Sequence, residues 1–464
     1  MAADSYSIGL TPMDHLLPRV YVPYILIFNT ADPESALHTI KNGVDMLVSK
    51  LPWLAGNITT LSEPSGPQNR VHIVPLSSTP EIPMLQVKYF DRDEDWHSHH
   101  AQSYIPLPTF IPVSQQRPVL RFQANIFPSK VVLATSYMHV VFDGTGFDTI
   151  VRAFSECCKD DTGTNMPITK TIAANDIDLR KEVSSWSSKC QTRLDHSREI
   201  GLPMLDSNVS AEQWGAIKSA MSSPVEEGRL TFCPRKIARI KSICVTILSQ
   251  KDTSAYISTN DIITAAMAIS IDRVLYPDRA STTDSTSVII PVNLRSRVSP
   301  PLPNTYLGNM IYSPIVDICH PARLDTQGEG EVEADLLHLA HLALRIRTSL
   351  DTLDETVVYS LCAAVADEPN HDWAKVEAKP ADITISSWRG KNIFALGFGK
   401  GLGSVEDFET HLGAAPGLCI LMPARTRLGP NDQPMTMQWE VCAVMKPGGV
   451  EGLRKDRLLG KLMA

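Results

Sequence analysis

The sequence predicts an α/β or α+β protein built from two lobes of similar size. The chain has 464 residues, enough for two or three domains of ordinary size. Both halves alternate β-rich apolar segments with segments whose apolar residues recur at helical spacing. A stretch at 186–229, rich in Ser, Glu, Lys and Asp and without clear periodicity, separates the halves. We therefore expect a first lobe at 1–185, a crossover linker at 186–229 and a second lobe at 230–464.

The first half opens with a β-rich segment, VYVPYILIFN, followed by a segment patterned as a helix. In chain order the expected elements are a strand at 20–29, a helix at 33–50, short strands at 71–76 and 84–90, a hairpin of 117–127 with 131–138, and a helix after Asp143. The turn PSK closes the hairpin.

The second half repeats the alternation without repeating the sequence. Its expected strands are at 229–234, 287–297, 381–388, 391–398, 417–425 and 435–445, and its helices at 235–247, 258–275 and 335–350. The helix at 258–275 has the strongest pattern, and Ser258 with Asp261 three residues later marks its start.

Composition and charge narrow the class of protein. Apolar residues make up 43% and charged residues 20%, as in a globular protein with a substantial core. The net charge of -8 and the dispersed Lys and Arg argue against nucleic acid or a membrane as partner. No apolar run reaches the ~18–20 residues that span a bilayer, and no secretory signal is visible. The nine cysteines are scattered, so most should be reduced thiols. We expect a cytoplasmic monomer.

The stretch YMHVVFDG at 137–144 ends a buried-looking strand with a histidine and, four residues later, an aspartate followed by glycine. His139 and Asp143 alone are a weak signal, because two residues at one spacing arise readily by chance. The context is more informative, since a strand precedes them and a helix follows Gly144. Catalytic groups gather at such corners because rigid elements hold them.

Other segments recur in the order and spacing of a known family. They are LTPMDHLLPRVYVPYILIF with Asp14, LPWLAGNI, the hairpin with HxxxDG, STNDIITAAMA, VNLRSR, PNTYLGNM (303–310) and ISSWRG (385–390). Together they resemble the BAHD acyltransferases, and more closely their fungal secondary-metabolite acetyltransferases. The resemblance covers nearly the whole chain. Asn57 stands where the family has Arg.

The second hallmark of that family, DFGWG, is altered. The stretch at its expected place, nine residues after Trp388, reads GFGKG (397–401), so the Asp has become Gly397 and the Trp has become Lys400. In the family this motif lies away from the reacting atoms and shapes the fold and the coenzyme channel. The departure therefore removes no catalytic group, but it bears on the choice of donor.

The resemblance implies a fold like chloramphenicol acetyltransferase, with a mixed sheet flanked by helices in each lobe and a solvent channel between the lobes. Acyl-CoA, most simply acetyl-CoA, would enter from one face as a cosubstrate and a small-molecule acceptor from the other. His139 would act as the general base on the acceptor hydroxyl, since the unperturbed pKa of histidine, about 6.5, suits that task. No GxSxG sequence suggests an acyl-enzyme.

The resemblance also assigns supporting residues. Asp143 would turn away from the ligand and pair with an arginine, Arg295 or else Arg297, while Gly144 would ease the turn. We assign Ser258, Ser387, Trp388 and Gly399 to the coenzyme side. Simple helix capping by Ser258 and ordinary packing of the Ser386–Trp388 strand remain alternatives. The basic run Arg235, Lys236, Arg239 and Lys241 could meet a phosphate or form a solvated helix face.

Two rival functions remain open. A condensation-type enzyme shares the fold and an HHxxxDG motif but takes acyl groups from carrier proteins, and Met138 in the first His position disfavours it. A repurposed scaffold would bind an intermediate and guide cyclisation or rearrangement. No permanent cofactor is expected: GFGKGLG does not match the GxGxxG of NAD or FAD sites. No metal is expected either, because WHSHH (96–100) lacks ligand spacing and reads as a surface loop, and His338 and His341 belong to a helix face.

Overall fold

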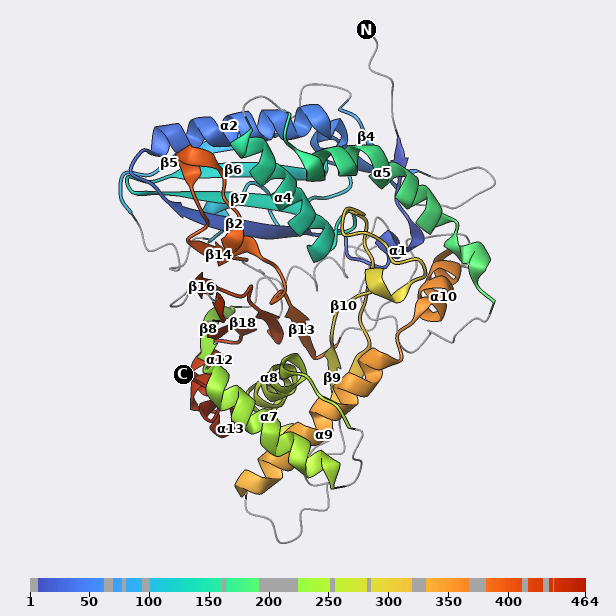
Figure 1. Cartoon of the computed structure of the whole chain (residues 1–464), viewed down its shortest axis with the longest axis vertical. Coiled ribbons are helices and arrows are strands. Elements are labelled where there is room, and N and C mark those ends of the chain that lie inside the picture. Colours follow the sequence, from blue (N-terminus) through green and yellow to red (C-terminus); the bar gives the residue numbers. More distant parts are fainter. Residues whose placement is uncertain are drawn as a thin grey trace.

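The chain folds into an upper and a lower lobe, stacked along the long axis in the computed structural model (Figure 1). The structure describes residues 7–61, 70–76, 81–93, 101–160, 164–191, 224–250, 255–281, 285–318, 331–366, 381–410, 416–428, 434–436 and 438–464. The first described residues, from Ser7, belong to the upper lobe, and the C-terminus lies on the lower one. None of the helices in these ranges is long and apolar enough to cross a membrane.

A five-stranded sheet forms the centre of the upper lobe. Its strands, in spatial order, are β14 (Asp407–Glu409), β2 (Tyr21–Asn29), β7 (Lys130–Met138), β6 (Leu120–Ile126) and β5 (Leu85–Tyr89). All pairs are antiparallel except β6 with β5. The long strands β2 and β7 pair over nine residues, from Tyr21 opposite Met138 to Asn29 opposite Lys130. This register fixes the end of β7, and so the position of the residue that follows it.

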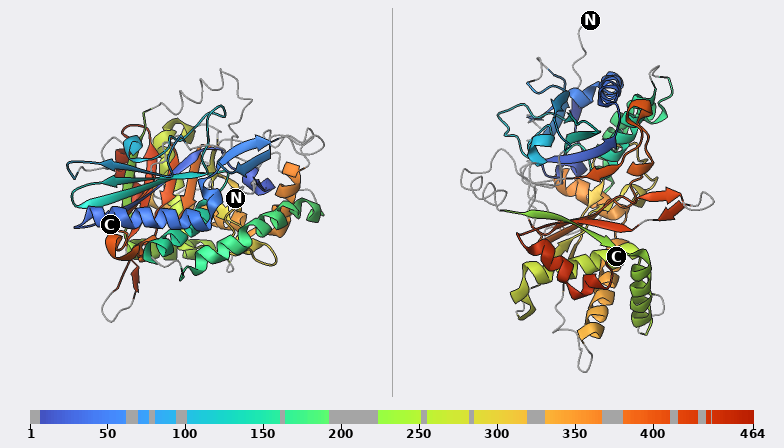
Figure 2. Two further views of the ribbon diagram at one scale, coloured as in Figure 1. Left: turned by 90° about the horizontal axis from the view of Figure 1, so that it is seen from above. Right: turned by 90° about the vertical axis from the view of Figure 1, so that its left-hand side faces the viewer.

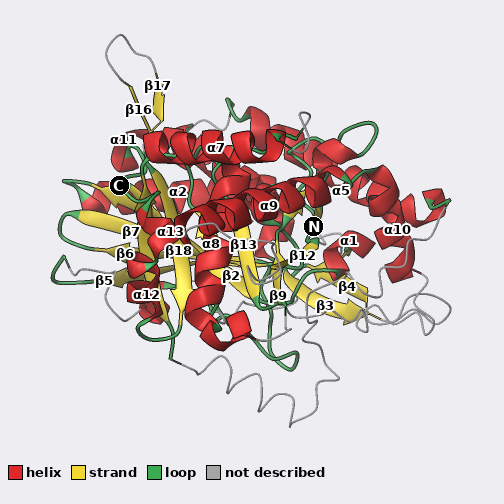
Figure 3. Ribbon diagram, turned by 90° about the horizontal axis from the view of Figure 1, so that it is seen from below, coloured by secondary structure: helices red, strands yellow, loops and turns green. Residues whose placement is uncertain are grey.

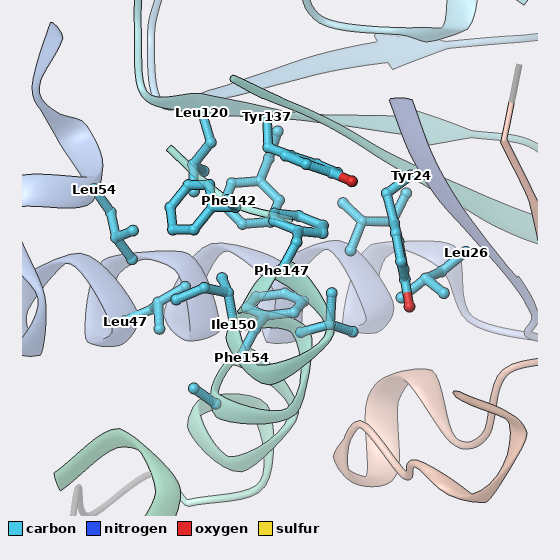
Figure 4. Close-up of a cluster of buried hydrophobic side chains, with 14 of the residues drawn as sticks. Tyr24, Leu26, Leu47, Leu54, Leu120, Tyr137, Phe142, Phe147, Ile150 and Phe154 are labelled. Atoms are coloured by element: carbon cyan, nitrogen blue, oxygen red, sulfur yellow. The ribbon is translucent and has the colours of Figure 1, made fainter. Parts of the chain in front are cut away.

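Two helices cover one face of this sheet, α2 (Pro33–Lys50) and α4 (Gly144–Lys159), and they pack against each other (Figure 1). Helix α5 (Pro167–Ser184) follows α4. The buried faces of these elements form one apolar cluster, in which Leu47 of α2 and Phe147, Ile150 and Phe154 of α4 meet the sheet (Figure 4). The apolar spacing in the sequence of α4 produces this face directly.

A six-stranded mixed sheet forms the lower lobe. Its strands, in spatial order, are β12 (Ile315–Ile318), β9 (Thr286–Ile289), β13 (Ile383–Ser387), β15 (Leu418–Leu421), β18 (Trp439–Met445) and β8 (Glu226–Phe232). Strand β13 is parallel to both of its neighbours, and the other pairs are antiparallel. The long pair of β8 (green) and β18 (red) crosses this lobe in Figure 2.

Helix α8 (Thr259–Leu275) is the central helix of the lower lobe. Nearly all of its residues are buried, as expected of a helix that is apolar on every side. The helices α7 (Pro234–Ser249), α9 (Glu331–Asp351), α12 (Gly449–Lys455) and α13 (Arg457–Gly460) surround it. Ser258 caps it, with the reciprocal bonds of a capping box to Asp261.

Smaller elements connect the two lobes and lie at their margins. They are α1 (Pro12–His15), α3 (Ala101–Tyr104), α10 (Glu355–Ala366), the strands β1 (Ile8–Gly9), β4 (Arg70–Val74) and β3 (Asn57–Leu61), and the two-residue strands β10 (Val292–Asn293) and β11 (Ile311–Tyr312). The hairpin of β16 (Thr426–Leu428) and β17 (Pro434–Thr436) projects from the body (Figure 3).

The structure departs from the division of the sequence at one place. The GFGKG stretch belongs to the second half of the chain, yet α11 (Gly399–Leu402) packs on α2 and β14 pairs with β2. Phe398 is fully buried in the core of the upper lobe, with its ring 5.1 Å from that of Phe28. Because Phe398 is buried there, the segment from Phe398 to β14 belongs to the upper lobe. The range 230–464 therefore does not form a lobe by itself.

Several expected strands also differ: that at 435–445 divides into β17 and β18, and two others do not form as single strands. Residues 391–398 form a 3₁₀ turn, Ile393–Ala395, and not a strand, because their apolar side chains join the upper core around a bend. The strand expected at 287–297 divides into β9, β10 and a 3₁₀ turn at Arg295–Arg297. Both cases show that a short apolar run does not by itself distinguish a strand from a turn.

Candidate active site

A cavity of about 530 Å³ lies where the two lobes meet. The upper lobe supplies β2, the end of β7 and the start of α4, and the lower lobe supplies β9, β13 and β15. Most of the lining is apolar. Apart from tyrosines, its ionisable side chains are those of His139, Asp382 and Lys391.

The backbone of His139 is held from two sides. Its N–H donates to the Val20 carbonyl at 2.9 Å, continuing the pairing of β2 with β7. The Asn309 side chain lies 3.0 Å from the carbonyl oxygens of both His139 and Val140. The side chain of His139 is half-buried and lines the cavity. These two hydrogen bonds fix the backbone of His139, and so the point from which its side chain enters the cavity.

Burial sets the protonation of this imidazole. Desolvation lowers the pKa of His139 below its ordinary value of 6.5, although the negative charge of Asp143 acts in the opposite direction. The ring is therefore neutral at physiological pH. A neutral imidazole at a cavity wall can accept a proton, which is what a general base requires.

The Asp143 carboxylate is fully buried and does not line the cavity. It accepts five hydrogen bonds: Oδ2 from Arg295 Nη1 at 2.8 Å and Met310 N–H at 2.8 Å, and Oδ1 from Arg295 Nη2 at 3.1 Å, Thr145 N–H at 2.9 Å and Gly146 N–H at 2.8 Å. Two of these N–H groups begin α4, so Asp143 is also its N-cap.

Charge balance keeps Asp143 ionised. Burial would raise the pKa of Asp143, but the Arg295 guanidinium and the backbone N–H groups outweigh it, so the pKa lies below the ordinary 3.8. The partner is thus Arg295, the first of the two candidates, whereas Arg297 donates to the Leu353 carbonyl at 3.1 Å. The carboxylate is committed to the corner and is not available to a ligand.

Gly144 lies at this corner, where a glycine is needed for space and not for an unusual backbone angle. Its φ is not positive; a Cβ there would instead stand 2.9 Å from Lys391 Nζ. Two residues on, a Cβ at Gly146 would lie 2.2 Å from the Leu307 carbonyl oxygen. Both glycines therefore permit a close approach of the second half of the chain to the start of α4.

Two site residues carry no role in the sequence analysis, Asn309 and Lys391. Asn309 receives its orientation from the buried Asp14, whose Oδ1 accepts from the Asn309 N–H at 2.7 Å and from Nδ2 at 3.0 Å. Burial raises the pKa of Asp14, while the Arg180 charge opposes the rise. Asp14 and Asn309 both lie in segments that resemble family motifs. Because 295 residues separate them in the chain, their contact is visible only in the fold.

The residues assigned to the coenzyme side are only partly brought together. Ser387 and Trp388 line the cavity, and the Ser387 hydroxyl donates to Asn260 Oδ1 at 2.8 Å, next to the start of α8. Ser258 does not line it: its Oγ accepts from the Asp261 N–H at 3.2 Å and from Arg347 Nη2 at 3.1 Å. These contacts are those of a helix cap, the alternative role that the sequence allowed for Ser258.

Gly399 lies outside this cavity. It borders a separate hollow of about 800 Å³ formed by α2, α4 and α11. Its φ of +79° and the approach of the Cys158 carbonyl oxygen, 2.6 Å from a Cβ at this position, require glycine. The structure therefore gives Gly399 a backbone role in the upper lobe, away from His139.

The other sequence candidates lie elsewhere. Residues 96–100 fall outside the described residues, and His338 is buried in the lower lobe. The basic run on α7 does not border the cavity: Lys236 donates to the Met463 carbonyl at 2.7 Å, and Lys241 lies over the Tyr256 ring. Eight of the cysteines are described, and none of these eight forms a disulfide with another described cysteine.

Sequence comparisons place this chain beside fungal acyltransferases. The family model described as Trichothecene 3-O-acetyltransferase-like N-terminal domain matches residues 20–158. The communesin N16 acyltransferase of Penicillium expansum is 30% identical over 480 residues, covering 97% of this chain and 96% of that protein. The fumigaclavine B O-acetyltransferase of Aspergillus fumigatus is 30% identical over 485 residues, covering 98% and 97%.

Solved structures share the fold. TRI101 of F. graminearum, in a crystal with coenzyme A and T-2 mycotoxin, has a TM-score of 0.72 at 18% identity, covering 98% of this chain and 99% of the other. Vinorine synthase has a TM-score of 0.60 at 17% identity, covering 98% and 94%. The expected two-lobed fold is thereby confirmed.

Proposed function

This chain belongs to the BAHD acyltransferase family, among its fungal O-acetyltransferases, and from that premise we propose the reaction and the role of each site residue. The chain is an acyltransferase that uses a CoA thioester as donor. The group transferred is acetyl, and the acceptor is a hydroxyl of a small natural product. The relatives named above, an O-acetyltransferase and an N16 acyltransferase, support this class of reaction.

One observation carries the assignment of the base: the half-buried imidazole of His139 lines the inter-lobe cavity, while the nearby carboxylate turns away. The imidazole takes the proton of the acceptor hydroxyl, and the oxygen attacks the thioester carbonyl carbon. The tetrahedral intermediate then expels the thiolate, to which the imidazolium returns the proton. Proton transfer by a positioned group of this kind contributes roughly 10²–10⁴-fold to the rate.

Asp143, Gly144 and Arg295 hold the corner that presents His139. The Asp143–Arg295 pair joins the start of α4 to the 3₁₀ turn at Arg295–Arg297. Asn309 holds the loop between β7 and α4 through its hydrogen bond to the His139 carbonyl. Ser387 and Trp388 line the same cavity beside the start of α8, where we assign them to the donor. Ser258 and Gly399 support this arrangement indirectly, through the cap of α8 and the turn at α11.

The test follows free thiol release from acetyl-CoA with a panel of hydroxylated and amine-bearing natural products. We expect release with a hydroxylated acceptor, together with a product heavier by one acetyl group. His139→Ala should lower the rate by about 10²–10⁴-fold without changing thermal unfolding. His38→Ala is the matched control, because this histidine is exposed on α2 beside the other hollow.

A His139→Ala variant that keeps the wild-type rate would refute the assignment of the base. The two rivals give different patterns. Thiol release only from a carrier-bound acyl group would indicate a condensation-type enzyme, although Met138, in the position of its first histidine, is fully buried in the core. No release from any donor would favour the repurposed scaffold.

We also propose that the enzyme is a cytoplasmic monomer. The absence of a disulfide among the eight described cysteines supports a reducing compartment. Size-exclusion chromatography with light scattering tests the oligomeric state, and a fluorescent fusion tests the location.

A further inference from the structure

Lys391 places an ammonium group in the wall of the acyl-transfer cavity. Its N–H donates to the Trp388 carbonyl at 3.0 Å, a tight turn that folds the side chain back over the indole. Nζ lies 3.9 Å from the centroid of the Trp388 ring and donates to the Gly144 carbonyl oxygen. Gly144, Trp388 and Lys391 all line the same cavity as His139. The second half of the chain thus delivers a cation to the HxxxDG corner.

No carboxylate of a described residue forms an ion pair with this ammonium, and its one hydrogen-bond acceptor is the Gly144 carbonyl. Of the charged groups around it, Asp143 is paired with Arg295 and Asp148 with Arg152 at 2.9 Å. Tyr24 adds only a ring face, 5.9 Å from Nζ. An ammonium has three donors, and one carbonyl accepts from only one of them.

The surroundings make this positive charge costly. Desolvation lowers the pKa of Lys391 to about 8, although the charges of Asp148 and Asp143 raise it and those of Arg295 and Arg152 lower it further. The remaining faces are the indole of Trp388 and the ring of Tyr24, with the neutral imidazole of His139 in the same lining. A cation kept in such a place has its largest effect on a negative charge that arises inside the cavity.

We propose that Lys391 is a catalytic residue for acyl transfer, whose ammonium stabilises the negative oxygen of the tetrahedral intermediate. When the acceptor oxygen bonds to the thioester carbon, the carbonyl π pair moves to oxygen, and the resulting oxyanion pairs with Nζ. When that pair re-forms the C=O bond, the C–S bond breaks and the thiolate takes its proton from His139. Lys391 keeps its own proton throughout.

This role differs from that of the neutral donors nearby. The Ser387 hydroxyl is already directed to Asn260 Oδ1, and the other lining groups that could donate carry no charge. A charge-assisted bond is roughly twice as strong as a neutral one. The inference rests on the proposed function, because it requires a CoA thioester to react in this cavity.

The test compares Lys391→Met, which keeps the length of the side chain without its charge, with Lys391→Arg, which keeps the charge to higher pH. Thiol release from acetyl-CoA is measured between pH 6 and 10, with kcat and KM determined separately. Lys391→Met should lower kcat by about 10²-fold at pH 7, with KM nearly unchanged, because removing one oxyanion donor costs about 10²–10³-fold.

The pH profile distinguishes chemistry from scaffolding. In the wild type, kcat should fall as the pH rises through about 8, where Lys391 loses its proton. Lys391→Arg should recover part of the rate and move this basic limb to higher pH. A purely structural contact to Gly144 would instead lower the rate equally at every pH and lower the thermal stability as well.

Three results would overturn the proposal. An unchanged kcat in Lys391→Met would show that the ammonium plays no part in the chemistry. A raised KM with kcat preserved would show that it binds an anionic group of a substrate in the ground state. Absence of thiol release from the wild type would refute acyl transfer itself, an outcome distinct from activity that does not depend on Lys391.

Discussion

Replacing Asp143 by alanine tests whether this carboxylate is part of the scaffold or of the chemistry. The substitution leaves the Arg295 guanidinium, with a side chain only 2% exposed, without its partner. It also removes the acceptor of three backbone N–H groups, those of Thr145, Gly146 and Met310. Breaking a buried pair by removing one partner costs about 3–5 kcal/mol.

At roughly 2–4 °C per kcal/mol for a domain of 150–250 residues, that cost lowers the melting temperature of the upper lobe by about 6–20 °C. Asp143→Ala/Arg295→Met should recover part of the loss, because it removes the unpaired charge as well. Asp178→Ala is the control: its carboxylate is 77% exposed beside Lys181, so the change should stay within about 0.5 kcal/mol.

The effect should also depend on pH. The folded-state pKa of Asp143 lies below 3.8, so the pair stabilises fully above that value and is lost as the pH falls through the folded-state pKa. Wild type and Asp143→Ala should therefore converge in stability in acid. Differential scanning fluorimetry measures the stability, and thiol release per folded molecule measures the activity. An Asp143→Ala variant of unchanged stability but no activity would refute the reasoning, because it would place the carboxylate in the reaction.

Three further outcomes follow from the geometry. Because desolvation lowers the pKa of His139, kcat/KM should fall on acidification with a midpoint below pH 6.5; a midpoint above 7 would contradict the neutral imidazole. Asn309→Ala should lower kcat about 10-fold or more by releasing the His139 carbonyl, and equal kinetics in variant and wild type would exclude a positioning role. Gly397→Asp should fold normally and stabilise by about 0–1 kcal/mol, since a Cβ there meets Lys159 only at ordinary contact distance; a large change in KM for acetyl-CoA would mean that the loop reaches the donor.

Elements with a strong local pattern were predictable. Helix α2 has the bounds expected from its apolar spacing, and the hairpin of β6 and β7 follows the alternation around PSK. Helix α5 carries no such signal, because buried Asp176 and Arg180 form an ion pair where an apolar stripe would normally stand. Its inner face mixes polar residues with Ile172 and Val183, so hydrophobic periodicity does not reveal it.

The site was predictable to the extent that one segment contains it. His139, Asp143 and Gly144 are contiguous with a strand and a helix, and their corner can be inferred from the sequence. The contribution of Asn309 depends on its contact with Asp14. That of Lys391 depends on a turn in a segment whose apolar pattern wrongly predicted a strand. Contacts between residues far apart in the chain arise from packing, which a single sequence does not display.

The pairing of β14 with β2 has a consequence for attempts to divide this protein. A fragment that ends before Asp407 lacks β14, the neighbour of β2 on its outer side, and so leaves the backbone of Ile25–Ile27 without a paired strand at the edge of the sheet. Open edges of that kind recruit other chains and promote aggregation. The two halves are therefore best produced as one polypeptide, and a split version should succeed only if the piece carrying β14 is supplied together with the first.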